Sequence, residues 1–144
     1  LYDLSQRSPI AVRTTLGQPY RRVMMQRQQA AGKQAASGSA GHTMPSTNDG
    51  KGVCFISHIG QVQPSGFLPI SAGNVRTGHL GEIYRHAPLF QELRDSSLLK
   101  GKCGVCPFNE VCGGCRARAY AMTGDYLQSD PSCVFQPQGV LISE

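Results

Sequence analysis

The chain has 144 residues, of which 40% are hydrophobic, and it carries a formal net charge of +5. This length provides one ordinary domain, and the scattered basic residues argue against a nucleic-acid-binding surface. We find no apolar run of membrane-spanning length and no secretory signal, so we expect a cytoplasmic protein without a membrane partner. In that reducing compartment, clustered cysteines are more often metal ligands or catalytic groups than disulfides.

The composition also indicates a small core. Seventeen glycines and nine prolines predict many turns for a chain of this length. A domain with a small hydrophobic core usually needs disulfides or a metal to stabilise it. The six cysteines supply the side chains for either kind of cross-link.

Residues 1–27 have the pattern of part of an α/β unit. A short helix near the N-terminus is ended by Pro9, residues 10–15 are β-prone, and a second helix is expected over 20–29. Helix, strand and helix in this order need neighbouring strands to close a sheet. Because the chain also begins with Leu1 rather than Met, we expect it to be an excerpt of a longer protein.

Residues 28–51 change in composition. Alanine, glycine, serine and glutamine dominate this segment, and it contains few apolar residues. Such a composition is typical of a flexible linker. We expect His42, which lies inside it, to be a solvated linker residue.

From residue 52 the pattern predicts a β-hairpin followed by short helices. Two β-prone runs, 53–59 and 61–70, flank Gly60, and Gly73-Asn74 has turn chemistry. Pro64 in the second run predicts a bulge or kink.

The helical pattern of this region comes in short pieces. Leu80 begins an apolar spacing that Pro88 ends, and a further helix is expected from Leu89. A last helix is expected over 114–122, with Gly124 at its C-terminal end.

The cysteines carry most of the functional information: Cys54, Cys103, Cys106, Cys112, Cys115 and Cys133. Several thiolates near one point select zinc or iron–sulfur clusters. A zinc ribbon usually has two Cys-x2-Cys pairs far apart in sequence, whereas Cys103, Cys106 and Cys112 lie in one short loop. A four-iron cluster, which is wider than one zinc ion, can take three ligands from such a loop and a distant fourth. The glycines at 104, 113 and 114 let backbone N–H groups approach cluster sulfurs. Spacing alone leaves a zinc site or a disulfide as alternatives.

At these residues the chain resembles the SPASM domain, the auxiliary-cluster module of many radical S-adenosylmethionine (SAM) maturases. The resemblance covers residues 52–137, and within that family it is nearest to the branch of haem-synthesis and d-type haem maturases. It rests on Cys103-x2-Cys106-x5-Cys112, the following Gly-Gly-Cys-Arg-Ala segment, Gly124-Asp125, 130–133, Cys54 and 59–64. It implies an α+β fold, with a hairpin and short helices around a cluster loop.

The family pattern implies one auxiliary [4Fe–4S] cluster, held by Cys103, Cys106, Cys112 and Cys133. A second cluster would take ligands from positions such as Cys54 and Cys115. Ser65 occupies the position of a further ligand, and Cys115 comes one residue early. We therefore expect one cluster, with Cys54 and Cys115 as spare thiols.

The same resemblance places residues 1–27 at the end of a radical SAM barrel, ahead of the linker, and residues 138–144 in a tail. The Cys-x3-Cys-x2-Cys signature of a SAM cluster is absent, so SAM binding and cleavage are expected only in a longer parent. The implied partners are the parent's radical SAM core, a peptide or tetrapyrrole substrate and an electron-donor protein. The auxiliary cluster would transfer electrons or position the substrate.

Other polar residues have structural and functional interpretations. Arg116 and Arg118 either neutralise the cluster or bind substrate carboxylates, or they pair with Asp125 or Glu110 on a helix face. We expect Asp125 and Asp130 to cap helices and turns rather than to act as acid–base catalysts.

The remaining candidates are histidines and the predicted N-terminal strand. His58 is expected to be structural, and His79 and His86 to be on the surface. Residues 13–15 could face the mouth of the barrel, where strand ends commonly bind ligands. Two other functions stay open: a stand-alone zinc-stabilised interaction module, and a recognition element whose strand edges pair with an extended peptide.

Overall fold

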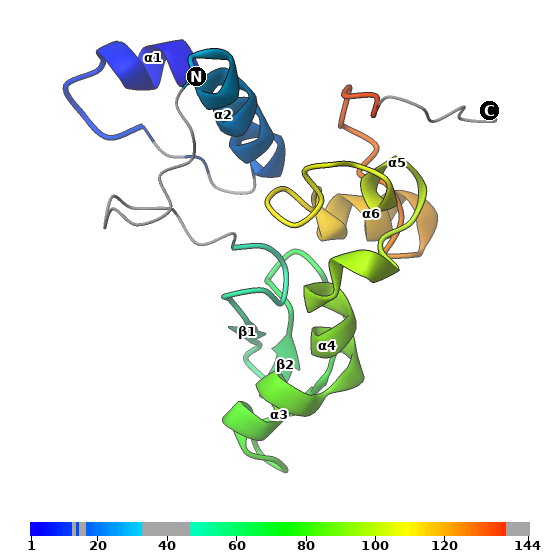
Figure 1. The fold of residues 1–144 in the computed structure, drawn as a ribbon. Helices are drawn as coiled ribbons and strands as arrows, with labels where there is room; N and C mark the ends of the chain where they lie inside the picture. The colour runs from blue at the N-terminus through cyan, green and yellow to red at the C-terminus, as the bar shows by residue number, and fades with distance from the viewer. Residues whose placement is uncertain (13, 15–16, 33–46, 138–144) are drawn as a thin grey trace.

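The computed structural model describes residues 1–12, 14, 17–32 and 47–137, and Figure 1 shows their arrangement. At the N-terminal end, helix α1 (Tyr2–Arg7) lies beside helix α2 (Gln18–Ala30). The Tyr20 hydroxyl donates to Ser5 Oγ over 3.2 Å, which links the two helices. Proline in the first turn of α2 fits that position, since it needs no N–H there.

The predicted strand over 10–15 differs from the structure. Residues 10–12 and 14 form no strand, and Arg13 and Thr15 lie outside the described residues. A strand needs a neighbouring strand to pair its N–H and C=O groups. The described part of the chain offers no partner at this place, so β propensity alone produces no ladder.

The sheet is small and antiparallel, with strands β1 (Phe55–Ile56), β2 (Gln61–Gln63) and β3 (Gly73–Asn74) in that order. Val62 is the central residue, opposite Ile56 on one side and Gly73 on the other. The hairpin around Gly60 is therefore present, with shorter strands than the sequence predicted. Gly73-Asn74 was predicted as a turn; the pair adds a third strand to β2, and Asn74 also begins the turn that follows, accepting the Arg76 N–H at its Oδ1 and the Thr77 N–H at its carbonyl.

Short helices follow the sheet: α3 (Leu80–His86), α4 (Pro88–Arg94), the 3-10 turn Ser96–Leu98, α5 (Gly101–Gly104) and α6 (Arg116–Thr123). Pro88 separates α3 from α4 as predicted, and it begins α4. Gly124 ends α6 with a left-handed φ of 75°, the conformation that glycine adopts at no cost in strain.

Two apolar contacts hold these elements together. Val62 of the sheet and Phe90 of α4 are fully buried, and the Phe90 ring meets Tyr84 of α3 edge to face at 5.0 Å. A second cluster joins α4 to α6 through Leu93 and Ala117, with Leu68 and Cys115. Figure 1 shows α4 between the sheet and the α5–α6 region.

The predicted linker differs from the structure at both of its described ends. Helix α2 continues to Ala30, and Asn48 and Asp49 are buried rather than solvated. Asn48 and Lys51 form a tight turn in which each backbone N–H donates to the other's carbonyl. His42 lies outside the described residues.

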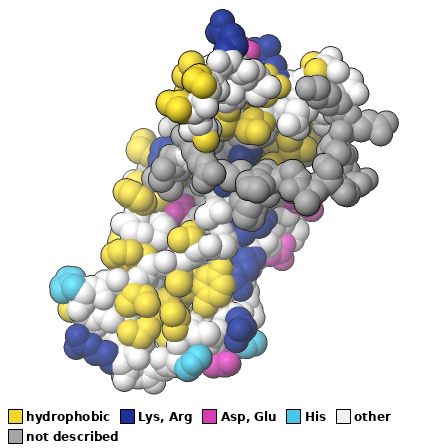
Figure 2. Space-filling view, turned by 90° about the vertical axis from the view of Figure 1, so that its left-hand side faces the viewer, with side chains coloured by type: hydrophobic (Ala, Val, Ile, Leu, Met, Phe, Trp, Pro, Cys, Tyr) yellow, Lys and Arg dark blue, Asp and Glu magenta, His cyan; other side chains and the backbone are white. Residues whose placement is uncertain are grey.

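The surface near the sheet is rich in apolar side chains. Figure 2 shows hydrophobic side chains gathered on the lower half of one face. Phe55 and Ile56 of β1, and Phe67 beyond β2, are among the exposed large hydrophobic residues. No helix within the described ranges combines the length and the apolar character that crossing a membrane requires.

Candidate cluster site

Four thiols line one pocket, those of Cys103, Cys106, Cys112 and Cys133. Cys103 belongs to α5, the next two cysteines lie in the turns that follow it, and Cys133 comes from the turn after α6. The structure therefore brings together the four cysteines that the family resemblance named. It does so across helix α6, which separates Cys133 from the others in sequence.

The electrostatics of Cys106 show that these thiols are close neighbours. Partial burial raises the pKa of the Cys106 thiol above its ordinary value, and the Phe108 backbone N–H opposes this rise. Negative charge on Cys103 and Cys133 raises the pKa further, while Arg22 lowers it. The thiol therefore resists ionisation unless a cationic centre compensates the charge.

Cys112 has the same kind of surroundings. Burial raises the pKa of its thiol, the Gly114 backbone N–H opposes the rise, and the other three thiols add to it. Because each of these sulfurs is affected by the charge of the others, several thiolates in this pocket would repel one another. A metal centre would remove that repulsion.

Glycine allows the cysteine loop to turn tightly against Cys103. Gly113 and Gly114 have φ values of 62° and 63°, in the left-handed region that glycine favours. A Cβ atom at Gly114 would lie 3.2 Å from Cys103 Sγ and 2.6 Å from Arg116 Nη2. The close approach of this backbone to the sulfur therefore requires the absence of a side chain.

Asp130 positions the turn that carries Cys133. Its carboxylate is fully buried and accepts the backbone N–H of Ser132 at 3.0 Å and that of Cys115 at 2.8 Å. The Cys133 N–H closes the turn on the Asp130 carbonyl at 3.1 Å. Asp130 thus has the capping role that the sequence predicted.

Arg118 neutralises this buried carboxylate. Its Nη2 lies 2.7 Å from Asp130 Oδ2 and its Nε lies 3.1 Å from Oδ1. Burial opposes ionisation of Asp130, but the hydrogen bonds from Arg118, Cys115 and Ser132 outweigh it and lower the pKa of the carboxyl. Of the alternatives for Arg118, an ion pair is present, but its partner is Asp130 rather than Asp125 or Glu110.

Arg116 points the other way, towards the thiols. Arg116 as a whole residue is only 2% exposed, and its Nη2 lies 3.6 Å from Cys103 Sγ. Nη1 donates to the carbonyls of Tyr126 and Gln128 at 2.9 and 2.7 Å. Of the alternatives for Arg116, the geometry favours neutralisation of the thiol site over a surface ion pair.

The other two cysteines lie elsewhere. Cys115 is buried in the apolar cluster with Leu68, Leu93 and Ala117. Cys54 is partly exposed and lines a separate cavity of about 370 Å³, together with Ser65. Cys54 and Ser65 thus share a cavity, but Cys115 does not line it.

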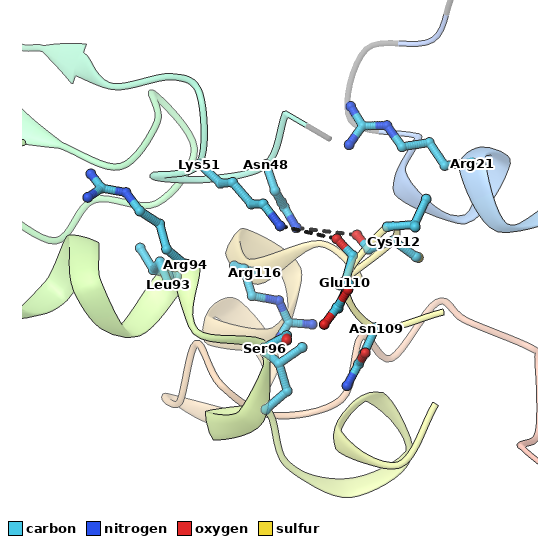
Figure 3. Close-up of a pocket in the computed structure, with 13 residues that line it drawn as sticks. Arg21, Asn48, Lys51, Leu93, Arg94, Ser96, Asn109, Glu110, Cys112 and Arg116 are labelled. Carbon is cyan, nitrogen blue, oxygen red and sulfur yellow. Dashed lines mark hydrogen bonds between the residues drawn. The ribbon is translucent and has the colours of Figure 1, made fainter. Parts of the chain in front are cut away.

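A second pocket borders the cysteine loop at Cys112 and Gly113, and most of the residues that line it are polar or charged, as Figure 3 shows. Asn48 Nδ2 donates to the carbonyls of Gly114 and Cys112 at 2.7 and 3.5 Å, and Lys51 Nζ donates to the Glu110 carbonyl at 3.1 Å. These bonds tie the turn at 48–51 to the loop that carries Cys112. Asn48 was missed by the sequence analysis, although the Asn-Asp-Gly run at 48–50 is a turn signal.

The four thiols share a pocket without meeting at a single point. In the part of the chain that the structure describes, no group of three or more His, Cys, Asp or Glu side chains is arranged so that it could hold a metal ion. A zinc ion holds thiolates at about 2.3 Å, so its ligands must converge closely. The sulfurs are therefore near enough to affect one another's charge but are not gathered at that spacing.

The three histidines that the structure describes do not line this pocket. His58 is exposed, and His79 caps α3 by accepting the Gly81 N–H. His86 is exposed and lies 3.5 Å from Glu82 on the same helix. The expectation that His79 and His86 are surface residues is confirmed.

Comparison with known proteins gives the family context. The chain is 41% identical over 138 residues to an AdoMet-dependent heme synthase of Methanosarcina barkeri, covering 94% of this chain and 40% of that protein. It is 39% identical to the corresponding protein of Nitratidesulfovibrio vulgaris over 139 residues, covering 95% and 38% respectively. No protein-family model matches the chain.

A second group of relatives covers less of the chain. A PqqA peptide cyclase of Rhodopseudomonas palustris is 34% identical over 88 residues, covering 53% of this chain and 23% of that protein. The chain spans about two fifths of the length of the heme synthases it matches. The resemblance to the haem-synthesis branch is thereby confirmed, and the chain is a homologue of the AdoMet-dependent heme synthases among the radical SAM proteins.

Proposed function

We propose that Cys103, Cys106, Cys112 and Cys133 hold one auxiliary [4Fe–4S] cluster, as part of a radical SAM protein that acts on a haem-related tetrapyrrole. The observation that carries this proposal is the shared pocket of the four thiols. Cys133 is separated in sequence from the other three cysteines by helix α6, so their shared pocket is a property of the fold. When bound, such a cluster would supply one-electron chemistry or a fixed place for the substrate.

The donor set fits an iron–sulfur cluster. Thiolates are the usual ligands of [4Fe–4S] clusters, and backbone N–H groups directed at the sulfurs are their usual surroundings. Such donors are present at Cys103 from Asp130, at Cys106 from Phe108 and at Cys112 from Gly114. Gly114 keeps a side chain out of this space.

The number of thiols in the pocket fits a four-iron centre. A four-iron cluster binds each thiolate at a different iron, so its ligands surround a larger volume than those of zinc. The four cysteines that line the pocket would provide one ligand for each iron.

The comparisons favour a tetrapyrrole over a peptide as the substrate of the whole protein. Similarity to the heme synthases extends over 94–95% of the chain, whereas similarity to the peptide cyclase of Rhodopseudomonas palustris covers 53%. The heme-synthase relatives therefore share the N-terminal residues as well as the cysteine region. We assign the same substrate class to the protein that carries this chain.

Anaerobic reconstitution with iron and sulfide tests the cluster. We expect about four irons per chain, with the broad visible absorption of a [4Fe–4S] centre. Metal analysis of protein purified without oxygen is the second measurement: a colourless chain that holds one zinc ion and takes up no iron would refute the proposal.

Titration with an iron porphyrin, monitored by its absorption, tests the substrate class, with a precursor peptide as the comparison.

A further inference from the structure

We infer that Arg116 acts through Cys103 to raise the reduction potential of the bound cluster. The inference rests on the proposed function, because it assigns a role to a residue beside the proposed cluster. Three features of the structure carry it: the fixed position of the guanidinium, its burial, and its place among the donors to the four sulfurs.

The guanidinium of Arg116 is held in one position. Nη1 donates to two carbonyls, those of Tyr126 and Gln128, in the segment between α6 and Asp130. Nη2 is thereby directed at Cys103 Sγ, 3.6 Å away, within the hydrogen-bonding range for sulfur. The planar guanidinium fixes both directions at once, which the single nitrogen of a lysine could not do.

Burial makes the sulfur the natural counter-charge. Arg116 is buried and has little water around it, and a buried cation is costly unless an anion compensates it. Two nearby carboxylates bind other cations, since Asp130 pairs with Arg118 and Asp125 with Lys100. Glu110 lines a pocket together with Arg116, but within the described residues no ion pair joins the two. Arg116 directly contacts Cys103 Sγ, which would be an anionic thiolate as a ligand of the proposed cluster.

Cys103 differs from the other sulfurs in the donors that reach it. Cys106 and Cys112 each receive a neutral backbone N–H, from Phe108 and Gly114. Cys103 receives the Asp130 N–H at 3.4 Å and, in addition, a charged donor from Arg116. Arg22 and Lys102 also line the pocket of the thiols, but among the described residues the charged donor that reaches a sulfur within hydrogen-bonding distance is Arg116.

The neighbouring Arg22 does not take the same role. Its guanidinium lies 4.5 Å from the centre of the Phe135 ring, and its Nη1 donates to Gln26 at 2.6 Å. Arg22 therefore affects Cys106 only by its charge at a distance, whereas Arg116 is in hydrogen-bonding contact with Cys103 Sγ.

The sign of the effect follows from charge. One-electron reduction by an external donor adds one negative charge to the cluster and its thiolates, and no bond to Arg116 forms or breaks. A positive hydrogen-bond donor stabilises the more negative, reduced state. Arg116 therefore makes the cluster easier to reduce.

A redox titration of the reconstituted full chain tests this inference. We expect Arg116→Gln to shift the midpoint potential to a more negative value, and Arg116→Lys to shift it less because the charge is retained. Arg85→Gln, which removes an exposed cation from α3, is the matched control and should leave the potential unchanged. An Arg116→Gln protein with about four irons and the wild-type potential would overturn the inference but leave the proposed function intact.

A measurement on the unmodified protein covers the case in which Arg116→Gln fails to hold a cluster. Wild-type chain labelled with ¹⁵N in the arginine guanidinium groups should show a weak ¹⁵N coupling in pulsed EPR of the reduced cluster. Arg22→Lys should keep this coupling and Arg116→Lys should lose it. Absence of the coupling in the wild type would refute the contact, whereas a wild type that takes up no iron would refute the proposed function as well.

Discussion

Two regions of the molecule have different kinds of interior. The sheet region comprises the sheet with α3 and α4, and the cysteine region runs from Ser96 to Phe135. The first has regular strands and helices around fully buried apolar side chains, Val62 and Phe90. The second has two short helices among turns, and its most deeply buried side chains include Arg116 and Asp130. Figure 1 shows the two regions adjoining through α4 and α6.

This difference has an energetic consequence. Apolar burial stabilises the sheet region by itself, since removal of Phe90 and Val62 from water is favourable without any particular partner. A buried ion or thiol is stabilised only by a specific partner. The cysteine region therefore depends on exact hydrogen bonds and, under the proposed function, on a bound cluster, and single substitutions should affect the two regions differently.

The largest expected effect comes from removing a cluster ligand. Cys106→Ser and Cys133→Ser should each reduce the iron content from about four per chain to near zero, because a serine hydroxyl is a poor replacement for a thiolate. Iron analysis after anaerobic reconstitution provides the measurement. Cys54→Ser is the matched control and should retain the iron, since Cys54 lines a different cavity; equal loss in all three variants would contradict the assignment.

The next effect comes from the glycine beside Cys103. Gly114→Ala should lower the melting temperature strongly and weaken cluster binding, because its Cβ would lie 2.6 Å from Arg116 Nη2 and 2.8 Å from Asp130 Cβ. Gly124→Ala is the control, with a similar φ of 75° but no heavy atom within 4 Å of the new Cβ. Gly124→Ala should lower the free energy of unfolding by only about 1 kcal/mol, the cost of placing a side chain on a residue with left-handed φ. Similar melting temperatures for both variants would show that the crowding is unimportant.

Asp130→Asn tests the buried ion pair of the cysteine region. At neutral pH this change should cost about 3 kcal/mol, the lower end for removing one partner of a buried pair, because Arg118 is partly exposed. The pKa of Asp130 is lowered in the folded chain, so its stabilisation is present above pH 3.8, the ordinary pKa, and is lost as the pH falls below it. Urea unfolding at several pH values should show the wild type and the variant converging in acid. A constant difference between them would exclude the carboxylate as its cause.

The smallest effect should come from the bond that joins the two regions. Tyr126 donates its hydroxyl proton to Glu92 of α4, and burial together with this bond raises the Tyr126 pKa to about 12. Because that pKa lies above the ordinary value of 10, the stabilisation is complete below pH 10 and is lost as the pH rises through 12. Tyr126→Phe should cost about 1 kcal/mol and remove one late-titrating tyrosine from the ultraviolet titration. A variant that keeps the late step would assign it to another of the five tyrosines.

Sequence reasoning was most successful where local chemistry decides. Pro88 and Gly124 are residues that end or begin helices by their own backbone geometry, and both do so here. The spacing of Cys103, Cys106 and Cys112 is likewise local, because the three residues lie in one short loop.

It was least successful where a distant partner decides. Residues 10–12 and 14 form no strand, while Gly73-Asn74 becomes β3 because β2 is beside it. Asn48 was predicted to belong to a linker, yet it is buried and its side chain donates to the carbonyls of Cys112 and Gly114. Neither outcome can be derived from local propensity, which tertiary contacts readily override.

The amino-acid sequence alone determined the four cysteines, their relation to the haem-synthesis branch, and the positions at which proline and glycine bound the helices, because these features depend on residue type and spacing. Tertiary structure decided that Cys133 joins the other three thiols while Cys115 enters the apolar cluster. It also decided that Arg118 binds Asp130 and Arg116 contacts Cys103. The physical reason is that charge and hydrogen-bond interactions act between atoms that are close in space, and only the folded chain sets those distances.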